Sequence, residues 1–311
     1  MNEINMVDEL WPNFFIVGAD KAGTSSLYAY LNEIPGIFMS RIKEPNYFAK
    51  KTILNNRPLR PIRDKKKYLN LFKKVKNETI IGEASPSYLA DPEAPTLIHQ
   101  VSPRAKILVS LRDPVERVYS NYLMLSRAGY LKSTFHNEIQ NSLRAKKNNV
   151  EDKLTLNNGL YYEHVKRYIS IFGHEQVKII IFEEFIKDAK STLEEILIFL
   201  NIKYELLNFK LDVFNKYGLV RGPLAQAVLR NSIIRRVSEQ LLSPSKRRFL
   251  KEHFLMKDVP KPKMEENDRE LLIDYYIQDV QKIKKLLGRE LSWKNFVNRL
   301  EGFSSNKENK E

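Results

Sequence analysis

A stretch of glycine, lysine and hydroxyl residues near the N-terminus has the composition of an anion-binding loop. Residues 14–26 read FFIVGADKAGTSS: apolar residues run into Gly18, and Gly23 follows five positions later. The loop of nucleoside-triphosphate-binding proteins, G-x-x-x-x-G-K-[ST], has this glycine spacing but places its lysine directly after the second glycine. Here Lys21 lies inside the loop and Thr24 takes the usual lysine position. The predicted chemistry is phosphate binding with a displaced cation.

The backbone of such a loop, together with the first turn of a following helix, offers several N–H groups to one anion. Lys21 adds a full positive charge, and hydroxyl side chains follow directly. A plain strand-to-helix turn with Lys21 in solvent is the alternative, but this concentration of residue types favours anion binding. The predicted set is Lys21, Ala22, Gly23, Thr24, Ser25 and Ser26.

A second cationic site is predicted after the apolar run KILVSL at 106–111. Arg112 follows this run directly, and Ser120 comes eight residues later, so the two side chains could clamp a separate phosphate. Two alternatives remain open. Arg112 could instead form an ion pair with Asp113 or Glu116. Asp113 could also hold Mg²⁺ in a nucleotide kinase or hydrolase.

Apolar runs and helical periodicity alternate along the first 200 residues. Continuous apolar runs at 14–17, 106–111 and 177–182 predict buried strands, and helices are expected over 24–32 and 114–127. Strands alternating with helices indicate a parallel sheet. The predicted fold class is therefore α/β: a P-loop-like three-layer fold with a central parallel sheet flanked by helices, plus C-terminal helices.

The domain organisation is expected to be simple. Residues 1–303 are predicted to form one domain, whose C-terminal part is helical from about residue 205. The polar residues 130–157 are expected to be irregular, and 184–200 to form one helix. Residues 304–311 read as a disordered tail.

The composition excludes some chemistry and favours certain partners. The chain of 311 residues has no cysteine, which rules out disulfides, thiolate metal ligands and a cysteine nucleophile. The net charge of +14 favours polyanionic ligands, and residues 57–76 concentrate basic side chains opposed only by Asp64. A nucleic-acid-binding protein is an alternative, but no such motif is visible. No signal peptide or membrane span is expected, which predicts a cytoplasmic protein.

Longer stretches resemble the sulfotransferases that use 3′-phosphoadenosine 5′-phosphosulfate (PAPS). FFIVGADKAGTSSLYAYLNEIPGI, followed by KEPNYF, resembles the start of these enzymes. KILVSLRDPVERVYSNYLM resembles their 3′-phosphate motif, R-[DN]-P-x-x-R-x-x-S-x-Y, and GEASPSYL is similar to the segment between the two. The later GLYYEHVKRYISIFGHEQVKIIIFEEF and YYIQDVQKIKKLLGRELSWKNF are similar to bacterial members and to the sulfotransferase domains of heparan-sulfate enzymes. The resemblance covers nearly the whole chain.

The resemblance implies a role for each phosphate motif. Lys21 and the backbone of 22–26 would bind the 5′-phosphosulfate of PAPS, while Arg112 and Ser120 would bind the 3′-phosphate. Lys216 and Arg221, in NKYGLVRG, stand where the family often has a second basic cofactor loop. The product would be 3′,5′-adenosine bisphosphate (PAP), and no metal is expected.

Sulfuryl transfer to a hydroxyl needs a general base for the acceptor proton. Glu44 in KEPNYF is the first candidate, because glycan-modifying members have a glutamate in a similar context, and Lys43 beside it is a candidate substrate contact. An exposed Lys–Glu pair at a turn is the alternative. Glu83 in GEASPSY is the second candidate for base or substrate contact. Histidine is a third option, offered by His99, His136 and His164.

The acceptor is predicted to be a carbohydrate or glycan, with a small molecule or lipid as the alternative. Ala84 stands where glycan enzymes have a substrate-binding lysine, and their FFD becomes Phe48-Ala49-Lys50, which loses an aspartate. Both departures argue against a heparan-like acceptor, although not against the donor.

Overall fold

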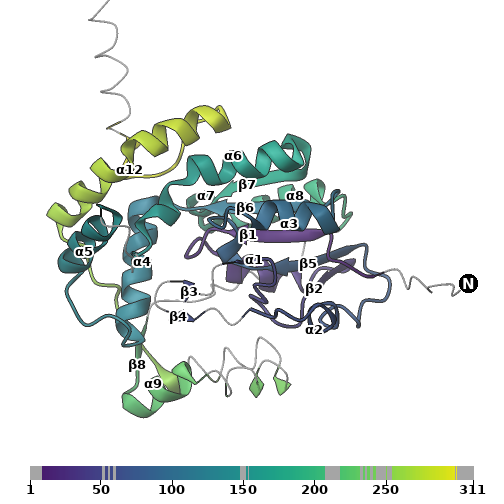
Figure 1. The fold of residues 1–311 in the computed structure, drawn as a ribbon, viewed down its shortest axis with the longest axis horizontal. Coiled ribbons are helices and arrows are strands. Elements are labelled where there is room, and N and C mark those ends of the chain that lie inside the picture. Colours follow the sequence, from purple (N-terminus) through teal and green to yellow (C-terminus); the bar gives the residue numbers. More distant parts are fainter. Residues whose placement is uncertain are drawn as a thin grey trace, which may run out of the picture.

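The computed structural model describes most of the chain, namely residues 9–50, 53–54, 57–58, 61–147, 152, 154–206, 218–231, 234, 237–238, 241–242, 250, 254–297 and 299. Its centre is a five-stranded, all-parallel sheet with strand order β2-β5-β1-β6-β7 (Figure 1). The strands are β1 (Phe14–Gly18), β2 (Ile37–Met39), β5 (Ile80–Ala84), β6 (Lys106–Leu111) and β7 (Val177–Ile181).

The alternating side chains of β1 explain why its apolar run is buried on both faces. Phe15 and Val17 belong to one core cluster, and Phe14 and Ile16 belong to the other. Successive strand residues point to opposite faces of a sheet, so each face needs its own covering layer. This is the arrangement that the continuous apolar runs predicted.

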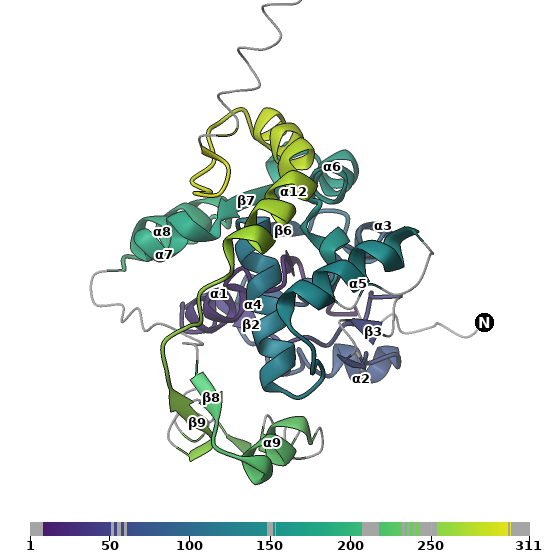
Figure 2. The ribbon, with the colours of Figure 1, turned by 90° about the vertical axis from the view of Figure 1, so that its left-hand side faces the viewer.

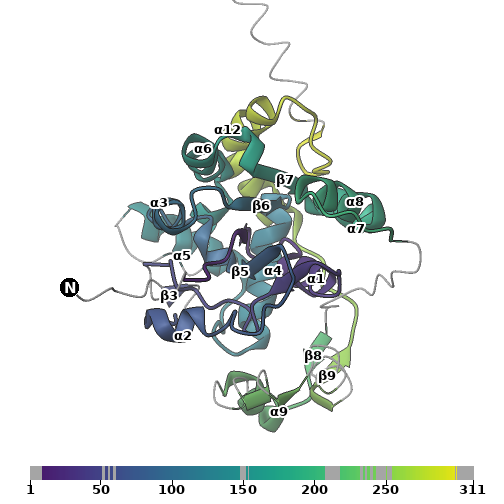
Figure 3. The same cartoon turned by 90° about the vertical axis from the view of Figure 1, so that its right-hand side faces the viewer.

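Helices supply these two layers. The first cluster packs against α3 (Ala94–Val101), α4 (Pro114–Arg127), α6 (Tyr161–Phe172) and α12 (Glu266–Leu287). The second packs against α1 (Thr24–Leu31), α7 (Phe182–Lys187) and α8 (Ala189–Phe199). Figure 3 shows α3 and α6 on one side of the sheet and α1, α7 and α8 on the other. The predicted three-layer α/β fold is confirmed.

Several predicted boundaries were wrong. Residues 130–157 are not irregular throughout, because α5 spans Phe135–Lys147. The helix predicted over 184–200 is two helices, because the Asp188 side chain caps a new helix by accepting a hydrogen bond from Ser191 N. Short elements also occur between β2 and β5: β3 (Ile53–Leu54), β4 (Arg57–Pro58) and α2 (Lys65–Leu69).

The C-terminal part is not purely helical. β8 (Gly218–Val220) and β9 (Met256–Asp258) pair as an antiparallel ribbon, beside α9 (Pro223–Arg230). Figure 2 shows this ribbon and α9 as a small projection from the α/β body. The predicted tail at 304–311 lies outside the described residues. Within the described part of the chain, no helix combines the length and apolarity needed to cross a bilayer.

Candidate active site

The predicted site residues follow the carboxyl ends of parallel strands. The loop 19–23 follows β1, Arg112 follows β6, Glu83 lies near the end of β5, and the segment 40–48 follows β2. Since parallel strands end at one edge, the order of strands places all of these at the carboxyl edge of the sheet. This edge is where open α/β sheets bind their ligands.

The loop after β1 has a backbone that requires glycine at its end. Gly23 is left-handed, with φ 80°, and a Cβ there would lie 2.8 Å from Cδ2 of Phe182. The Ala22 carbonyl accepts a hydrogen bond of 2.6 Å from Ser110 Oγ, which ties the loop to β6. Thr24 then begins α1. The loop therefore turns tightly from β1 into the N-terminus of a helix, as an anion site needs.

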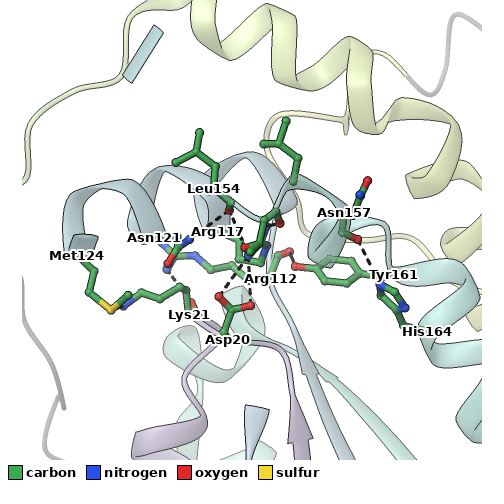
Figure 4. Close-up of polar contacts among 12 residues, drawn as sticks. Asp20, Lys21, Arg112, Arg117, Asn121, Met124, Leu154, Asn157, Tyr161 and His164 are labelled. Atoms are coloured by element: carbon green, nitrogen blue, oxygen red, sulfur yellow. Dashed lines mark hydrogen bonds and ion pairs between the residues drawn. The ribbon is translucent and has the colours of Figure 1, made fainter. Parts of the chain in front are cut away.

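Lys21 points from this loop toward α4. Its Nζ lies 3.6 Å from Sδ of Met124 (Figure 4). Ser120 is half-buried on α4, one helical turn before Met124, so the two side chains share a face of the helix. Lys21 Nζ therefore lies against the same helix that carries Ser120, the hydroxyl predicted for the second phosphate.

Arg112 is attached to the same loop. Its Nη1 donates a hydrogen bond of 2.9 Å to the Lys21 carbonyl, and its guanidinium lies 4.8 Å from the ring centroid of Phe182. Burial lowers the pKa of Arg112 from its ordinary value. The buried Nε of Arg112 has no hydrogen-bond partner among the described residues. A buried donor without a partner is costly, and a bound anion would satisfy it.

The alternatives for Arg112 and Asp113 are disfavoured by how the nearby carboxylates are used. Glu116 pairs with Lys261 at 2.8 Å and with Arg269 at 3.4 Å. Asp113 caps α4 by accepting from Val115 N at 3.0 Å, and it accepts from Asn295 Nδ2 at 2.8 Å. A carboxylate occupied in this way is poorly placed to hold Mg²⁺. Among the described residues, no group of three or more His, Asp or Glu could hold a metal ion.

Sequence reasoning missed an ion pair that joins the loop to α4. Arg117 is fully buried and its Nη1 lies 3.2 Å from Oδ1 of Asp20. Its Nη2 donates a hydrogen bond of 2.7 Å to the Thr155 carbonyl. Burial lowers the pKa of Arg117, but the charge of Asp20 and the contributions of Tyr276 and Tyr161 together outweigh it, and the net shift is upward. The second arginine of RDPVER was the available signal, although its partner could not be read from the chain.

Glu44 lies in a segment held against the end of β5. Its backbone N–H donates a hydrogen bond of 2.9 Å to the Ala84 carbonyl, and its φ is 62°. Lys43 Nζ lies 2.6 Å from Glu44 Oε1, and the two side chains are 19% and 30% exposed. The pair is thus half-buried rather than fully solvated, which places a reachable carboxylate at the edge.

Glu83 is buried completely at the end of β5. Burial raises its pKa to about 7, although hydrogen bonds from Ser85, Tyr68 and Tyr88 oppose the shift. This geometry does not favour direct contact with an acceptor. The role predicted for Glu83 as base or substrate contact stays a prediction, and Glu44 is the better placed of the two.

The remaining candidates lie elsewhere or have other partners. His136 Nδ1 lies 2.6 Å from Asp268 Oδ1, His164 Nε2 lies 3.2 Å from the Asn157 carbonyl, and the His99 ring contacts Phe172. These contacts give the histidines structural partners.

The second basic loop predicted for the cofactor is only partly described. Arg221 is exposed on the β8–β9 ribbon, where its Nε donates a hydrogen bond of 2.7 Å to the Met256 carbonyl. Lys216 lies outside the described residues. Within residues 57–76, Arg63 is exposed but donates from Nη1 to the Ala49 carbonyl at 2.5 Å. Arg221 and Arg63 therefore each donate to a backbone carbonyl of the chain itself.

The site defines an α/β protein with cationic and hydroxyl groups at the carboxyl edge of its sheet. The model of the sulfotransferase domain family matches residues 12–217. The chain belongs to the sulfotransferase domain family, and the predicted resemblance is confirmed. The alternative of a nucleotide kinase or hydrolase has no support from the comparisons.

Individual relatives agree with this assignment. Human carbohydrate sulfotransferase 15 is 30% identical over 245 residues, which cover 61% of this chain and 44% of that protein. Human bifunctional heparan sulfate N-deacetylase/N-sulfotransferase 3 is 29% identical over 197 residues, covering 61% of this chain and 22% of that protein. The chain thus spans less than half the length of these relatives.

A solved structure extends the likeness to the fold. The crystal structure of a sulfotransferase from Alicyclobacillus acidocaldarius superposes with a TM-score of 0.67 at 30% identity. The match covers 91% of this chain and 98% of that one.

Proposed function

We propose that this protein transfers the sulfuryl group of PAPS to a hydroxyl or amine of a carbohydrate acceptor. The observation that carries the proposal is the joining of two cationic sites at one edge: Arg112 donates directly to the carbonyl of Lys21. A donor with phosphate at both ends of its nucleoside suits two linked anion sites.

Residues 19–26 with Arg112 and Ser120 form what we name the donor side. The bound donor would supply an activated sulfuryl group and a phosphate leaving group. The Gly23 turn and the N-terminus of α1 would hold the 5′ end, and Lys21 would stabilise negative charge that grows on the leaving oxygen. Arg112, whose Nε lacks a partner among the described residues, would hold the 3′-phosphate with Ser120.

Residues 40–48 with Glu83 form what we name the acceptor side. Glu44 would accept the proton of the attacking hydroxyl, which is the work of a general base. Lys43 would keep the Glu44 carboxylate oriented through their 2.6 Å contact and could also touch an anionic acceptor. The chemistry then depends mainly on holding acceptor and donor in line.

The carbohydrate acceptor is supported by the names of the relatives, which are carbohydrate and heparan sulfate sulfotransferases. The loss of the lysine at Ala84 and of the aspartate at 48–50 still argues against a heparan-like chain. A small-molecule or lipid acceptor is the second possibility. The cytoplasmic location stays a prediction.

The donor is tested by the shift in melting temperature that ligands produce. PAP should raise the melting temperature equally with and without EDTA, because no residue assigned here needs a metal ion. ATP should have little effect, since it lacks a 3′-phosphate for Arg112. A shift seen with ATP only in the presence of Mg²⁺ would contradict the proposal.

The acceptor is tested with radiolabelled PAPS and a panel of glycans, glycolipids and phenols. Transfer to an oligosaccharide, lost in Glu44→Gln, supports the proposal. Transfer to phenols alone would replace the carbohydrate acceptor by a small molecule and leave the donor assignment standing.

A further inference from the structure

A fully buried carboxylate with no direct role in the proposed reaction lies beside the segment that carries Glu44. Oε1 of Glu83 accepts hydrogen bonds from Tyr68 Oη at 2.7 Å and from Tyr88 Oη at 2.9 Å. Its Oε2 accepts one from Ser85 Oγ at 2.7 Å. Three hydroxyl donors offset part of the cost of burying the ionised group.

Two of these three hydroxyls also accept a hydrogen bond from the acceptor side. Ser85 Oγ accepts from Asn46 N at 3.1 Å, and Tyr88 Oη accepts from Phe48 N at 3.3 Å. A hydroxyl has one hydrogen and two lone pairs. Because ionised Glu83 draws both hydrogens toward itself, both hydroxyls keep lone pairs for the backbone amides. The carboxylate therefore sets the direction of two chains of hydrogen bonds, which we call relays. One runs from Asn46 N through Ser85 Oγ to Glu83, and the other from Phe48 N through Tyr88 Oη to Glu83.

The segment held by these relays has a backbone that needs support. Glu44 and Asn46 have φ of 62° and 52°, in the left-handed region that residues other than glycine rarely adopt. Asn46 Nδ2 donates to the Glu44 carbonyl at 2.8 Å, and Ser87 Oγ donates to Asn46 Oδ1 at 2.7 Å. Anchoring Asn46 thus anchors Glu44 as well.

We propose that Glu83 is a positioning residue that holds Glu44 in place for catalysis through the hydroxyls of Ser85 and Tyr88. This inference rests on the proposed function, in which Glu44 is the base. In Glu83→Gln, the amide offers an NH₂ group to one hydroxyl, which must then accept rather than donate. The hydrogen of the reversed hydroxyl loses its acceptor, so the hydroxyl is no longer held in the orientation that presents a lone pair to the backbone amide, and the segment loosens.

Tyr68 and Tyr88 offer a matched pair of variants. Both are fully buried, both donate to the same oxygen of Glu83, and only Tyr88 also accepts from the segment. We expect Tyr88→Phe to lower kcat by about tenfold more than Tyr68→Phe, the effect of one lost hydrogen bond. The dissociation constant for PAP should be the same in both variants. Equal losses of kcat would overturn the proposal.

Amide hydrogen exchange of Asn46 and Phe48 supplies a readout that does not depend on Glu44 being the base. Tyr88→Phe should speed exchange of the Phe48 amide, and Ser85→Ala should speed exchange of the Asn46 amide. Glu83→Gln should speed exchange of one or both of these amides. Unchanged exchange in all variants would overturn the relays. If Glu44→Gln retains turnover, the proposed base is wrong, while the exchange rates still decide the relays. Should Glu83→Gln fail to fold, the tyrosine and serine variants decide.

Discussion

The donor side and the acceptor side hold their charged groups in opposite ways. On the donor side, Arg112 is buried with its Nε unpartnered within the described structure, although its Nη1 is bonded to the loop. On the acceptor side, Glu83 accepts hydrogen bonds from three hydroxyls, and Glu44 is paired with Lys43. The donor side retains an unmet need for an anion, whereas the acceptor side balances its carboxylates within the chain.

This difference fits the different tasks proposed for the two sides. A site binds an anion most tightly when its hydrogen-bond donors have no strong competing partner in the free protein. A general base must be held at one position and must exchange a proton at neutral pH. Both requirements need neighbouring groups that contact the carboxylate. Substitutions on each side test this contrast.

Glu44→Gln should separate the two sides most clearly. Removing a general base costs about 10²- to 10⁴-fold in rate, so we expect kcat to fall by that amount. Affinity for PAP should not change, because the donor side is intact. Steady-state kinetics and calorimetric titration with PAP measure the two effects. Full turnover in the variant would move the base elsewhere, with Glu83 next to test.

Asp20→Ala tests the part of the donor side where a cation already has a partner. It leaves the charge of Arg117 buried and unpaired, and we expect the free energy of unfolding to fall by about 3 kcal/mol. Chemical denaturation measures this loss. Glu195→Ala is the control. Glu195 forms an ion pair of 2.8 Å with Lys178 at the surface, and such a pair should contribute less than about 1 kcal/mol to stability. Similar losses in both variants would remove the special role of Asp20.

Glu83 predicts a pH dependence that arises on the acceptor side. Burial raises its folded-state pKa from 4.5 to about 7. Between these values the folded state binds the proton more tightly than the unfolded state, so stability falls as pH rises through this window. Over the whole window the loss is on the order of 3 kcal/mol.

The comparison that isolates this effect is wild type against Glu83→Gln. Other buried carboxyls with raised pKa values, such as Asp113 and Glu183, remain in both proteins. The free energy of unfolding at pH 5 and pH 8 should differ more in wild type than in the variant. Parallel pH profiles would show that the Glu83 carboxyl is not titrating in this range.

Arg112→Lys should give the smallest of these effects, confined to the donor side. Lysine keeps the charge but loses both the contact of the guanidinium with the Phe182 ring and the forked donors. We expect affinity for PAP to weaken about tenfold, measured by titration, with little change in stability. Arg289→Lys, at an exposed pair with Glu184, is the control and should leave affinity unchanged. Equal affinity in Arg112→Lys would contradict the second anion site.

Much of the donor side was predictable because its residues are close in sequence. Gly18, Lys21, Gly23 and Thr24 lie within one strand-to-helix turn, and Arg112 directly follows a continuous apolar strand. Local spacing therefore indicated both anion sites. The ion pair of Asp20 with Arg117 escaped prediction, because 97 residues separate its partners and nothing in the sequence links them.

The acceptor side was less predictable for the same physical reason. The resemblance ranked Glu44 ahead of Glu83 as the candidate base, but the sequence did not show how each carboxylate is surrounded. Their difference, half-buried beside Lys43 or fully buried among hydroxyls, follows from the packing of α2 and β5. The β8–β9 ribbon was missed because its strands are three residues each and distant in sequence.

The α/β alternation, the two predicted phosphate motifs and the family could be read from the chain, because these depend on local periodicity and on residues within a single turn. Tertiary structure alone decided which charges are satisfied. It brought Asp20 and Arg117 together as an ion pair and surrounded Glu83 with hydroxyls. It left Arg112 Nε without a hydrogen-bond partner among the described residues. Partners of this kind come together only when the strands align at one edge of the sheet.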